Sequence, residues 1–156
     1  MSVISSVTAD ELDDVVTMFE EDLSSLHIEH EKESLERIVR AVIKEPKTSI
    51  LWGIRSSADA PLEGVLFANV YRSVKHAGPA IWLEQLYVRP SARRHGLGRK
   101  LVNALLDWAE DNEIQGIDLE SYRLNAPASI LYRTLGFRRL GRERFTIELW
   151  DDEETE

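Results

Sequence analysis

The sequence contains no cysteine, so it can form no disulfide, thiolate metal site or cysteine nucleophile. It also lacks an uninterrupted apolar run near the roughly 20 residues that span a bilayer. Residues 1–6 show neither the basic nor the apolar segment of a signal peptide, and we therefore expect a cytoplasmic protein. With 156 residues, 43% of them hydrophobic and 30% charged, the chain has the size and composition of one globular domain.

Basic residues are in the minority. The 19 lysines and arginines face 28 aspartates and glutamates, which gives a formal net charge of −9. Such a surface disfavours nonspecific binding to the phosphates of nucleic acid. We therefore expect no nucleic-acid partner. Because the sequence has no segment that could span a bilayer, we also expect no membrane partner.

Two segments near the N-terminus carry apolar side chains at helical spacing. Residues 9–26 and 32–44 are each predicted to form a helix, after a first strand predicted at residues 3–7. Thr8 and Glu11 have the spacing of a capping box at the start of the first helix. The outer faces of both helices are strongly acidic. Two interpretations stay open: a solvated surface, or a rim that attracts a cationic substrate.

The period then changes to two. Residues 48–55, 63–72 and 80–88 are predicted to form an antiparallel meander, because only short turns separate them. The third segment is apolar except for Glu84 and Gln85, which is typical of a strand inside a sheet with both faces covered. The turns are expected at residues 56–61 and 75–79.

A strand–helix–strand crossover is expected next. Residues 97–111 have one apolar helical face, and residues 114–121 are predicted to form a strand parallel to the one at 80–88. The fold class is therefore α/β in the broad sense (mixed α+β), with helices on both faces of a mixed sheet.

The C-terminal part is predicted to hold one helix and one hairpin. Asn125 can cap the start of the helix, and Gly136 is suited to its end. Residues 137–140 and 144–150 are predicted to form a hairpin around Gly141. Residues 1–150 are thus predicted to be a single domain, followed by an acidic tail at 151–156 that we expect to be disordered.

The turn between residues 89 and 100 contains several basic side chains, two glycines and no acidic residue. It follows a strand-like segment and leads into a helix, so backbone N–H groups gather at a helix N-terminus, where an anion is favoured. Gly96 and Gly98 let the main chain approach a ligand closely. The turn therefore predicts a ligand that carries phosphate.

Motifs around this turn indicate a family. They are Leu86-Tyr87-Val88-Arg89-Pro90, Arg93-x-x-Gly96-x-Gly98, Asn125-x-x-Ala128 and Leu131-Tyr132-x-x-x-Gly136-Phe137. In combination they resemble the GNAT superfamily of acetyl-CoA-dependent N-acetyltransferases. The resemblance implies a central, mostly antiparallel sheet with a splayed parallel pair of strands and helices on both faces. It also implies acetyl-CoA as the acetyl donor, and no metal.

The resemblance further implies which residues bind the cofactor. Backbone groups of Leu86 and Val88 would pair with pantetheine, and the N–H near Leu86 or Tyr87 would polarise the thioester carbonyl. Asn125 is at the position of a side-chain contact to the pantetheine arm. The turn that would hold the pyrophosphate consists of Arg93, Arg94, His95, Gly96, Leu97, Gly98, Arg99 and Lys100, and Tyr132 completes the set.

The expected chemistry is attack of a neutral amine on a thioester. An alkylamine with a pKa of about 10.4 is mostly protonated at pH 7 and must lose a proton, while the thiolate must gain one. Tyr132, at the family's tyrosine position, is the predicted general acid. Glu84 is the predicted base, since burial in an apolar strand would raise its pKa. Glu120 is the alternative base, or a ligand for the substrate ammonium.

Other interpretations of these residues stay open. Glu84 could be a structural carboxylate paired with an arginine, and Tyr132 a core aromatic residue. His27 and His30 have no obvious third ligand, so a metal site is not expected.

The acceptor is expected to be a primary amine of a small cationic molecule or a peptide. The alternatives are acetylation of protein lysines or N-termini, and a CoA-binding regulatory domain without turnover. Many family members are homodimers through C-terminal strands, and an apolar edge for this could come from Phe145, Ile147, Leu149 and Trp150.

Overall fold

The computed structural model describes residues 1–122 and 125–149, which fall into two compact units. The first unit comprises Met1–Tyr122, the second begins at residue 123, and each is described by itself. In chain order the first unit contains β1 (Val3–Ser6), a 3₁₀ helix (Ala9–Glu11), α1 (Leu12–Ser25), α2 (Lys32–Lys44), β2 (Ser49–Arg55), β3 (Gly64–Ser73), β4 (Gly78–Val88), a second 3₁₀ helix (Pro90–Ala92), α3 (Leu97–Asp111) and β5 (Gly116–Leu119). The second unit contains α4 (Ala126–Thr134).

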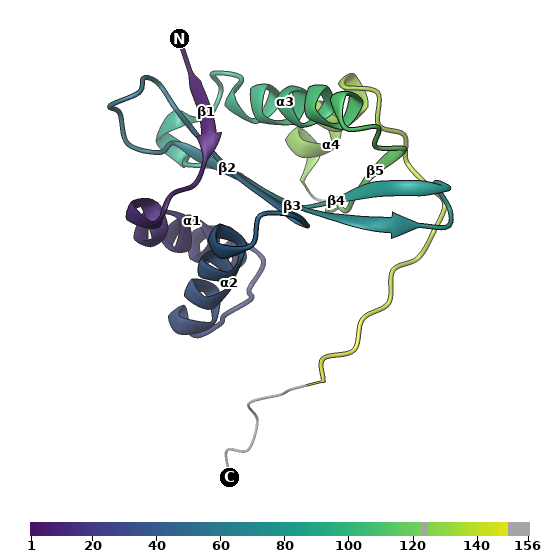
Figure 1. Cartoon of the computed structure of the whole chain (residues 1–156), viewed down its shortest axis with the longest axis horizontal. Helices are drawn as coiled ribbons and strands as arrows, with labels where there is room; N and C mark the ends of the chain where they lie inside the picture. Colours follow the sequence, from purple (N-terminus) through teal and green to yellow (C-terminus); the bar gives the residue numbers. More distant parts are fainter. Residues whose placement is uncertain (123–124, 150–156) are drawn as a thin grey trace. The chain divides into compact units, whose positions relative to one another are not determined.

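The five strands form one sheet in the order β1-β2-β3-β4-β5 (Figure 1). The first four strands are antiparallel neighbours, and β5 is parallel to β4. Within this unit α1 and α2 lie on one face of the sheet and α3 on the other (Figure 1). The predicted fold class, meander and crossover are therefore confirmed.

The face of the sheet that packs on α1 and α2, called the α1 face below, carries the larger apolar cluster. Val65, Phe67 and Tyr87 of the sheet pack with buried residues of both helices, and the Phe19 and Phe67 ring centroids are 6.2 Å apart. On the opposite face α3 packs against β2, β3 and β4. Among the described residues, no helix has the length and apolar character that a membrane crossing requires.

Most predicted boundaries agree with the structure. The helix predicted at 32–44 has these bounds, and the one predicted at 9–26 begins with a 3₁₀ turn before α1. β4 starts at Gly78, so Gly78 and Pro79 belong to a strand rather than to the predicted turn. Proline is tolerated here because it lies at the start of the strand, where its carbonyl accepts the N–H of Gln115 at 2.8 Å.

The predicted C-terminal hairpin is wrong for the residues that the structure describes. Residues 137–149 contain no strand, and Phe145 and Ile147 are 85% and 80% exposed. Alternating apolar residues specify a strand only where a neighbouring strand accepts its hydrogen bonds, and an isolated two-stranded hairpin is marginally stable in water. Trp150 and the predicted tail at 151–156 lie outside the described residues.

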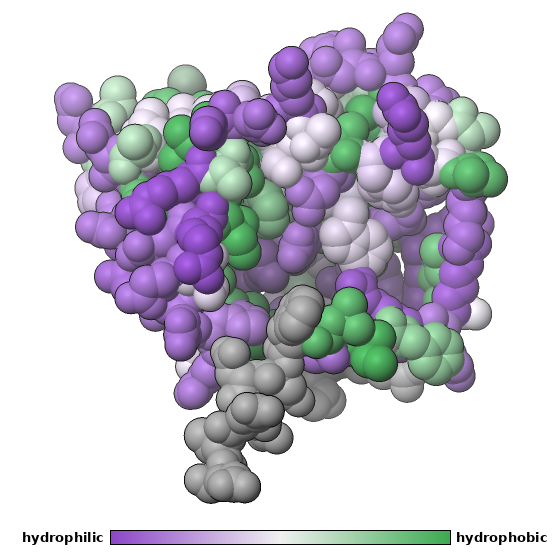
Figure 2. Space-filling model, turned by 60° about the horizontal axis from the view of Figure 1, so that its bottom comes forward, coloured by the Kyte–Doolittle hydropathy of each residue, from purple (hydrophilic) through white to green (hydrophobic). Residues whose placement is uncertain are grey.

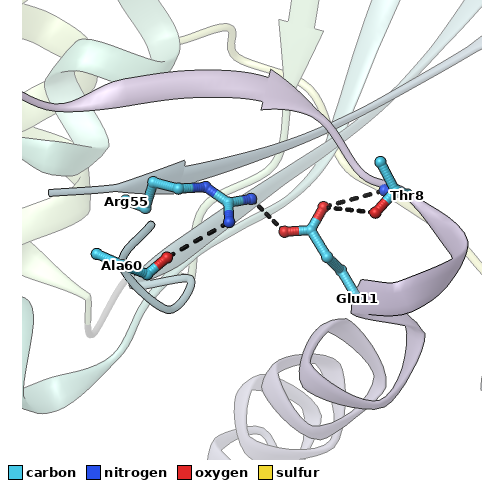
Figure 3. Close-up of polar contacts among 4 residues, drawn as sticks. All are labelled: Thr8, Glu11, Arg55 and Ala60. Atoms are coloured by element: carbon cyan, nitrogen blue, oxygen red, sulfur yellow. Dashed lines mark hydrogen bonds and ion pairs between the residues drawn. The ribbon is translucent and has the colours of Figure 1, made fainter. Parts of the chain in front are cut away.

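Glu11 connects the start of the first helical segment to β2. One carboxylate oxygen accepts the N–H of Thr8 at 3.0 Å and its hydroxyl at 3.2 Å, as the capping box predicts (Figure 3). The other oxygen pairs with the guanidinium of Arg55, which also donates to the carbonyl of Ala60 at 3.4 Å (Figure 3). Burial raises the pKa of Glu11, but the bonds from Arg55 and Thr8 outweigh it and leave that pKa below the usual 4.5.

A second polar cluster fixes β5. The carboxylate of Asp118 contacts His76 Nε2 at 2.8 Å and accepts the hydroxyl of Tyr71 at 3.1 Å. Burial, together with Asp118, raises the pKa of Tyr71. The imidazole of His76 fills the space above Gly116, where a Cβ atom would lie 2.2 Å from Nδ1. The turn between β3 and β4 is thereby attached to β5.

The Glu11 interaction yields a stability prediction. Glu11→Gln should lower the free energy of unfolding at neutral pH by about 1–3 kcal/mol, because the partly buried Arg55 loses its charged partner. A carboxylate whose folded pKa is depressed stabilises above its unfolded pKa, and this contribution is lost as pH falls through the folded value. Urea unfolding should therefore show the difference between wild type and variant shrinking below about pH 4. Glu20→Gln, on the exposed surface of α1, is the control, and an equal loss there would contradict this account.

Candidate active site

The parallel pairing of β4 with β5 ends near the middle of β4, where β5 itself ends. Their pairing runs from Ala80 opposite Gly116 to Leu83 opposite Leu119, while β4 continues to Val88. Within residues 1–122, no other strand takes the place of β5 beside the remainder of β4. The edge of β4 from Glu84 to Val88 therefore has no paired strand among these residues, and this unpaired edge is called the opening below.

A β-bulge lies at the start of this opening. Ala68 pairs with Leu83 and Phe67 pairs with Gln85, so Glu84 has no residue opposite it in β3. A bulge places two successive side chains on the same face. Because paired residues share a face, Gln85 lies on the α1 face with Phe67, and Glu84 joins it there through its hydrogen bond to Asn69.

Beyond the bulge the backbone of β4 is directed into the opening. The N–H of Arg89 donates to the carbonyl of Glu63 at 2.8 Å, on the β3 side. Since successive peptide groups of a strand point to opposite sides, the N–H and C=O groups of Leu86 and Val88 point away from β3. The carbonyl of Val88 accordingly accepts Arg93 Nε at 2.9 Å. The Leu86 N–H thus faces the opening, whereas the Tyr87 N–H faces β3.

The basic turn forms an open helix N-terminus. Gly96 has a φ of +72° and precedes the first residue of α3, and Arg94 also has a positive φ of +69°. Lys100 donates to the carbonyl of Gly96, so the N–H groups of residues 97–99 precede the first hydrogen bond of the helix. No side chain caps them. Such N–H groups favour an anion.

The basic side chains of this turn fall into two groups, some lining a cavity and the others exposed to solvent. Nζ of Lys100 donates to the Ser2 hydroxyl at 3.1 Å, and Nδ1 of His95 contacts the carbonyl of Ala92 at 3.2 Å. Both line a cavity of about 250 Å³ near the ends of β1, β2 and β3. The other lining residues are Ser2, Ser56, Glu63, Ser91, Ala92 and Leu97. Arg93, Arg94 and Arg99 are exposed.

The environment of Glu84 differs from the predicted one. Its side chain is exposed, so the predicted burial is wrong. The residue lies on the α1 face of β4 but outside the apolar cluster under the helices, which explains its exposure. Its partner is not an arginine: Glu84 Oε2 accepts Asn69 Nδ2 at 3.0 Å.

Tyr87 connects β4 to the last turns of α1. Its hydroxyl donates to Glu21 Oε2 at 2.6 Å, and the guanidinium carbon of Arg93 lies 5.5 Å from the ring centroid. Burial and the Glu21 carboxylate raise the pKa of Tyr87 to about 12. The sequence places Glu21 in an acidic helix face, but gives no sign that it meets a residue 66 positions later.

Asp22, beside Glu21, is half-buried and close to the charge of Arg93. Burial raises the pKa of Asp22 to about 6, and the Arg93 charge opposes that shift. Sequence reasoning missed Asp22 as well as Asn69. Both are ordinary surface-type residues whose surroundings arise only in the folded chain.

The remaining predicted residues lie at the ends of elements or in the second unit. Glu120 directly follows β5 and is exposed. Asn125 caps α4, since its side chain accepts the N–H of Ala128 at 3.3 Å. Tyr132 lies in α4, with its ring edge-on to Phe137 at a centroid distance of 5.8 Å. Among the residues described, no cluster of three or more histidine and acidic side chains could hold a metal ion.

Comparison with known proteins shows the family to which this chain belongs. The model of the acetyltransferase (GNAT) family matches residues 12–137. This match covers most of the chain, and the protein belongs to that family. The predicted family is confirmed.

Solved structures share the fold at low sequence identity. A possible acetyltransferase from Clostridium difficile 630 has a TM-score of 0.82 and 18% identity, with 97% of this chain and 99% of that chain covered. AAC(6′)-Iy in complex with a bisubstrate analogue, CoA-S-monomethyl-acetylneamine, has a TM-score of 0.78 and 17% identity, with coverage of 95% and 98%. A predicted acetyltransferase with acetyl-CoA from Clostridium acetobutylicum has a TM-score of 0.75 and 16% identity, with coverage of 96% and 97%. At these identities the likeness shows the fold alone.

The environment of Asp22 yields a prediction. A carboxyl whose folded pKa is raised above its unfolded value stabilises at low pH, and that contribution is lost as pH rises through the folded value near 6. Asp22→Asn should therefore raise the urea midpoint near pH 8 and have a smaller effect near pH 4. Asp13→Asn, an exposed change on the same helix, is the control. A stabilisation that is equal at both pH values would contradict the role of burial.

Proposed function

We propose that this protein transfers the acetyl group of acetyl-CoA to a primary amine of a small cationic molecule or peptide, by direct attack in a ternary complex. The observation that carries the proposal is the opening beside β4, which begins where the pairing with β5 ends at Leu83 and Leu119. The backbone groups of Leu86 and Val88 face this opening, and the turn that follows β4 leads to the uncapped N-terminus of α3.

Each part of this arrangement suits one part of acetyl-CoA. The N–H groups of residues 97–99 suit the pyrophosphate, with Arg93, Arg94 and Arg99 adding positive charge. The Leu86 C=O and the Val88 N–H suit the amides of the pantetheine arm, which would pair with this edge of β4 as a further strand does. Asn125 is the proposed side-chain contact to this arm. His95 and Lys100 line a cavity together with Leu97, one of these N–H donors.

The reaction forms a carbon–nitrogen bond and breaks the carbon–sulfur bond of the thioester. The Leu86 N–H donates to the carbonyl oxygen as negative charge develops on it, which is the role of an oxyanion hole. Glu84 accepts the proton of the ammonium group, directly or through water, with Glu120 as the alternative. Tyr132 gives its proton to the departing thiolate, and the second proton, which the nitrogen loses as the amide forms, restores the tyrosine hydroxyl. The exposed position of Glu84 suits transfer through water better than direct contact in a dry pocket.

The charge of the α1 face supports a cationic acceptor. Since α3 covers the opposite face, the acceptor has access to Glu84 from the α1 face, where Glu21, Asp22 and Asp118 also lie. Figure 2 shows hydrophilic side chains at the left of the view, where α1 and α2 come forward. The negative charge comes from α1, which contains no lysine or arginine and carries the acidic rim, Asp13, Asp14, Glu20, Glu21 and Asp22. A surface with many carboxylates attracts cations and raises the concentration of a cationic acceptor near the site. The acidic rim is therefore part of the proposal.

Purified protein should release CoA from acetyl-CoA when a suitable amine is present. The test is a thiol-release assay with a polyamine, an aminoglycoside, a lysine-containing peptide and a peptide with a free N-terminus, followed by mass analysis of the acetylated product. The KM of a cationic acceptor should rise with salt, because screening weakens the attraction of the acidic rim. Stoichiometric binding of CoA without turnover of any amine would contradict the proposal and indicate a regulatory CoA-binding domain.

The two proton-transfer roles are tested by conservative variants. Tyr132→Phe and Glu84→Gln should each lower kcat by about 10²-fold or more, the usual contribution of general acid–base catalysis. Their matched controls are Tyr122→Phe and Glu113→Gln, which remove the same groups from exposed positions. Unchanged turnover in either test variant would remove that residue from the mechanism. Glu120→Gln would then be examined as the alternative base.

A further inference from the structure

A chain of side-chain hydrogen bonds crosses three strands and ends at Glu84. The hydroxyl of Ser49 on β2 donates to Asn69 Oδ1 on β3 at 2.7 Å. Asn69 Nδ2 in turn donates to Glu84 Oε2 on β4 at 3.0 Å. Ser49 and Asn69 are directly paired across β2 and β3, so their side chains share a face of the sheet. The chain therefore runs along the α1 face toward the opening.

The two ends of the amide give this chain a direction. An amide oxygen accepts only, and an amide nitrogen donates only. The ionised carboxylate of Glu84 can only accept, so the nitrogen of Asn69 must face it and the oxygen must face Ser49. The serine hydroxyl can rotate to donate to that oxygen. Each group thus fixes the orientation of the next, from β2 to Glu84.

Glu84 depends on this chain because of the bulge. It has no residue opposite it in β3, and its side chain is exposed. A glutamate at such a position samples several rotamers, and holding it in one opposes its conformational entropy. Asn69 offsets this cost with a hydrogen bond to an ionised group. Because that bond occupies Oε2, the other oxygen, Oε1, is left to accept a proton.

We propose that Asn69, supported by Ser49, is a positioning residue that holds Glu84 in the orientation needed to accept the proton of the acceptor amine. The inference rests on the proposed acetyltransferase function and on Glu84 as its base. Asn69 does not touch the reacting atoms in this account. Its effect on catalysis passes through Glu84 alone.

That dependence is tested with a double-mutant cycle. Asn69→Ala should lower kcat by about tenfold, with the KM for acetyl-CoA changed by less than about twofold, since positioning affects the chemical step and not cofactor binding. Ser49→Ala should have a smaller effect in the same direction. In a Glu84→Gln background, Asn69→Ala should change kcat by less than about twofold, because the group it positions is already absent.

Tyr71→Phe is the matched control. Tyr71 lies two residues from Asn69 on the same strand and donates a hydrogen bond to Asp118 rather than to Glu84. Its loss should leave kcat within about twofold of wild type in both backgrounds. Thermal unfolding of every variant separates loss of turnover from loss of fold, and kcat is compared only on folded protein.

The outcomes separate the positioning role from the proposed function. Wild-type protein that acetylates no amine overturns both. If the wild type turns over and Glu84→Gln leaves kcat unchanged, the role of Asn69 is overturned and the acetyltransferase proposal stands. The role of Asn69 is also overturned if Asn69→Ala reduces kcat equally in the two backgrounds, or if it lowers only the unfolding temperature. A loss of kcat that requires Glu84 supports the positioning role.

Discussion

One extra residue in β4 determines much of what surrounds the candidate active site. Glu84 has no partner in β3, and the strand beyond it continues with its alternation reset. The same irregularity places Gln85 on the α1 face next to Glu84 and precedes the segment whose backbone faces the opening. Bulges bend the strand that contains them and increase its local twist. The end of pairing with β5 one position earlier, at Leu83, fits this bend.

The α1 face combines groups that a purely structural sheet would not need. Tyr87 and Arg93 are held together at the end of β4, and Glu21 of α1 accepts the tyrosine hydroxyl. Asp22 lies next to them in surroundings that disfavour its charge, so at neutral pH it lowers stability rather than adding to it. Perturbed carboxylates of this kind gather at functional sites more often than elsewhere. Helix α1 therefore connects the acidic surface to the strand that carries Leu86.

Patterns within a few residues were sufficient to predict most of the fold. The helices, the meander and the parallel crossover follow from apolar periodicity, caps and turn residues, each of which is encoded locally. The basic glycine turn likewise becomes an uncapped helix N-terminus in the structure. The prediction of a hairpin after Gly136 fails because its alternation needs a neighbouring strand, which sequence pattern alone does not supply.

The site was harder to predict where it depends on register. Burial of Glu84 was inferred from apolar neighbours in sequence, but the residue lies on the α1 face outside the apolar cluster under the helices, and no local pattern shows where that cluster ends. Asn69 and Glu21 reach their partners across 15 and 66 positions, respectively, and no local pattern encodes such contacts.

The contact between His76 and Gly116 has a consequence for how this chain can vary. A side chain at 116 would overlap the imidazole ring, and removal of the ring would leave Asp118 with Tyr71 as its partner in the cluster. Substitutions at 76 and 116 are therefore coupled, although one lies in a turn and the other at the start of a strand. In related sequences the two positions should change together, with a small residue at 76 wherever 116 is larger than glycine.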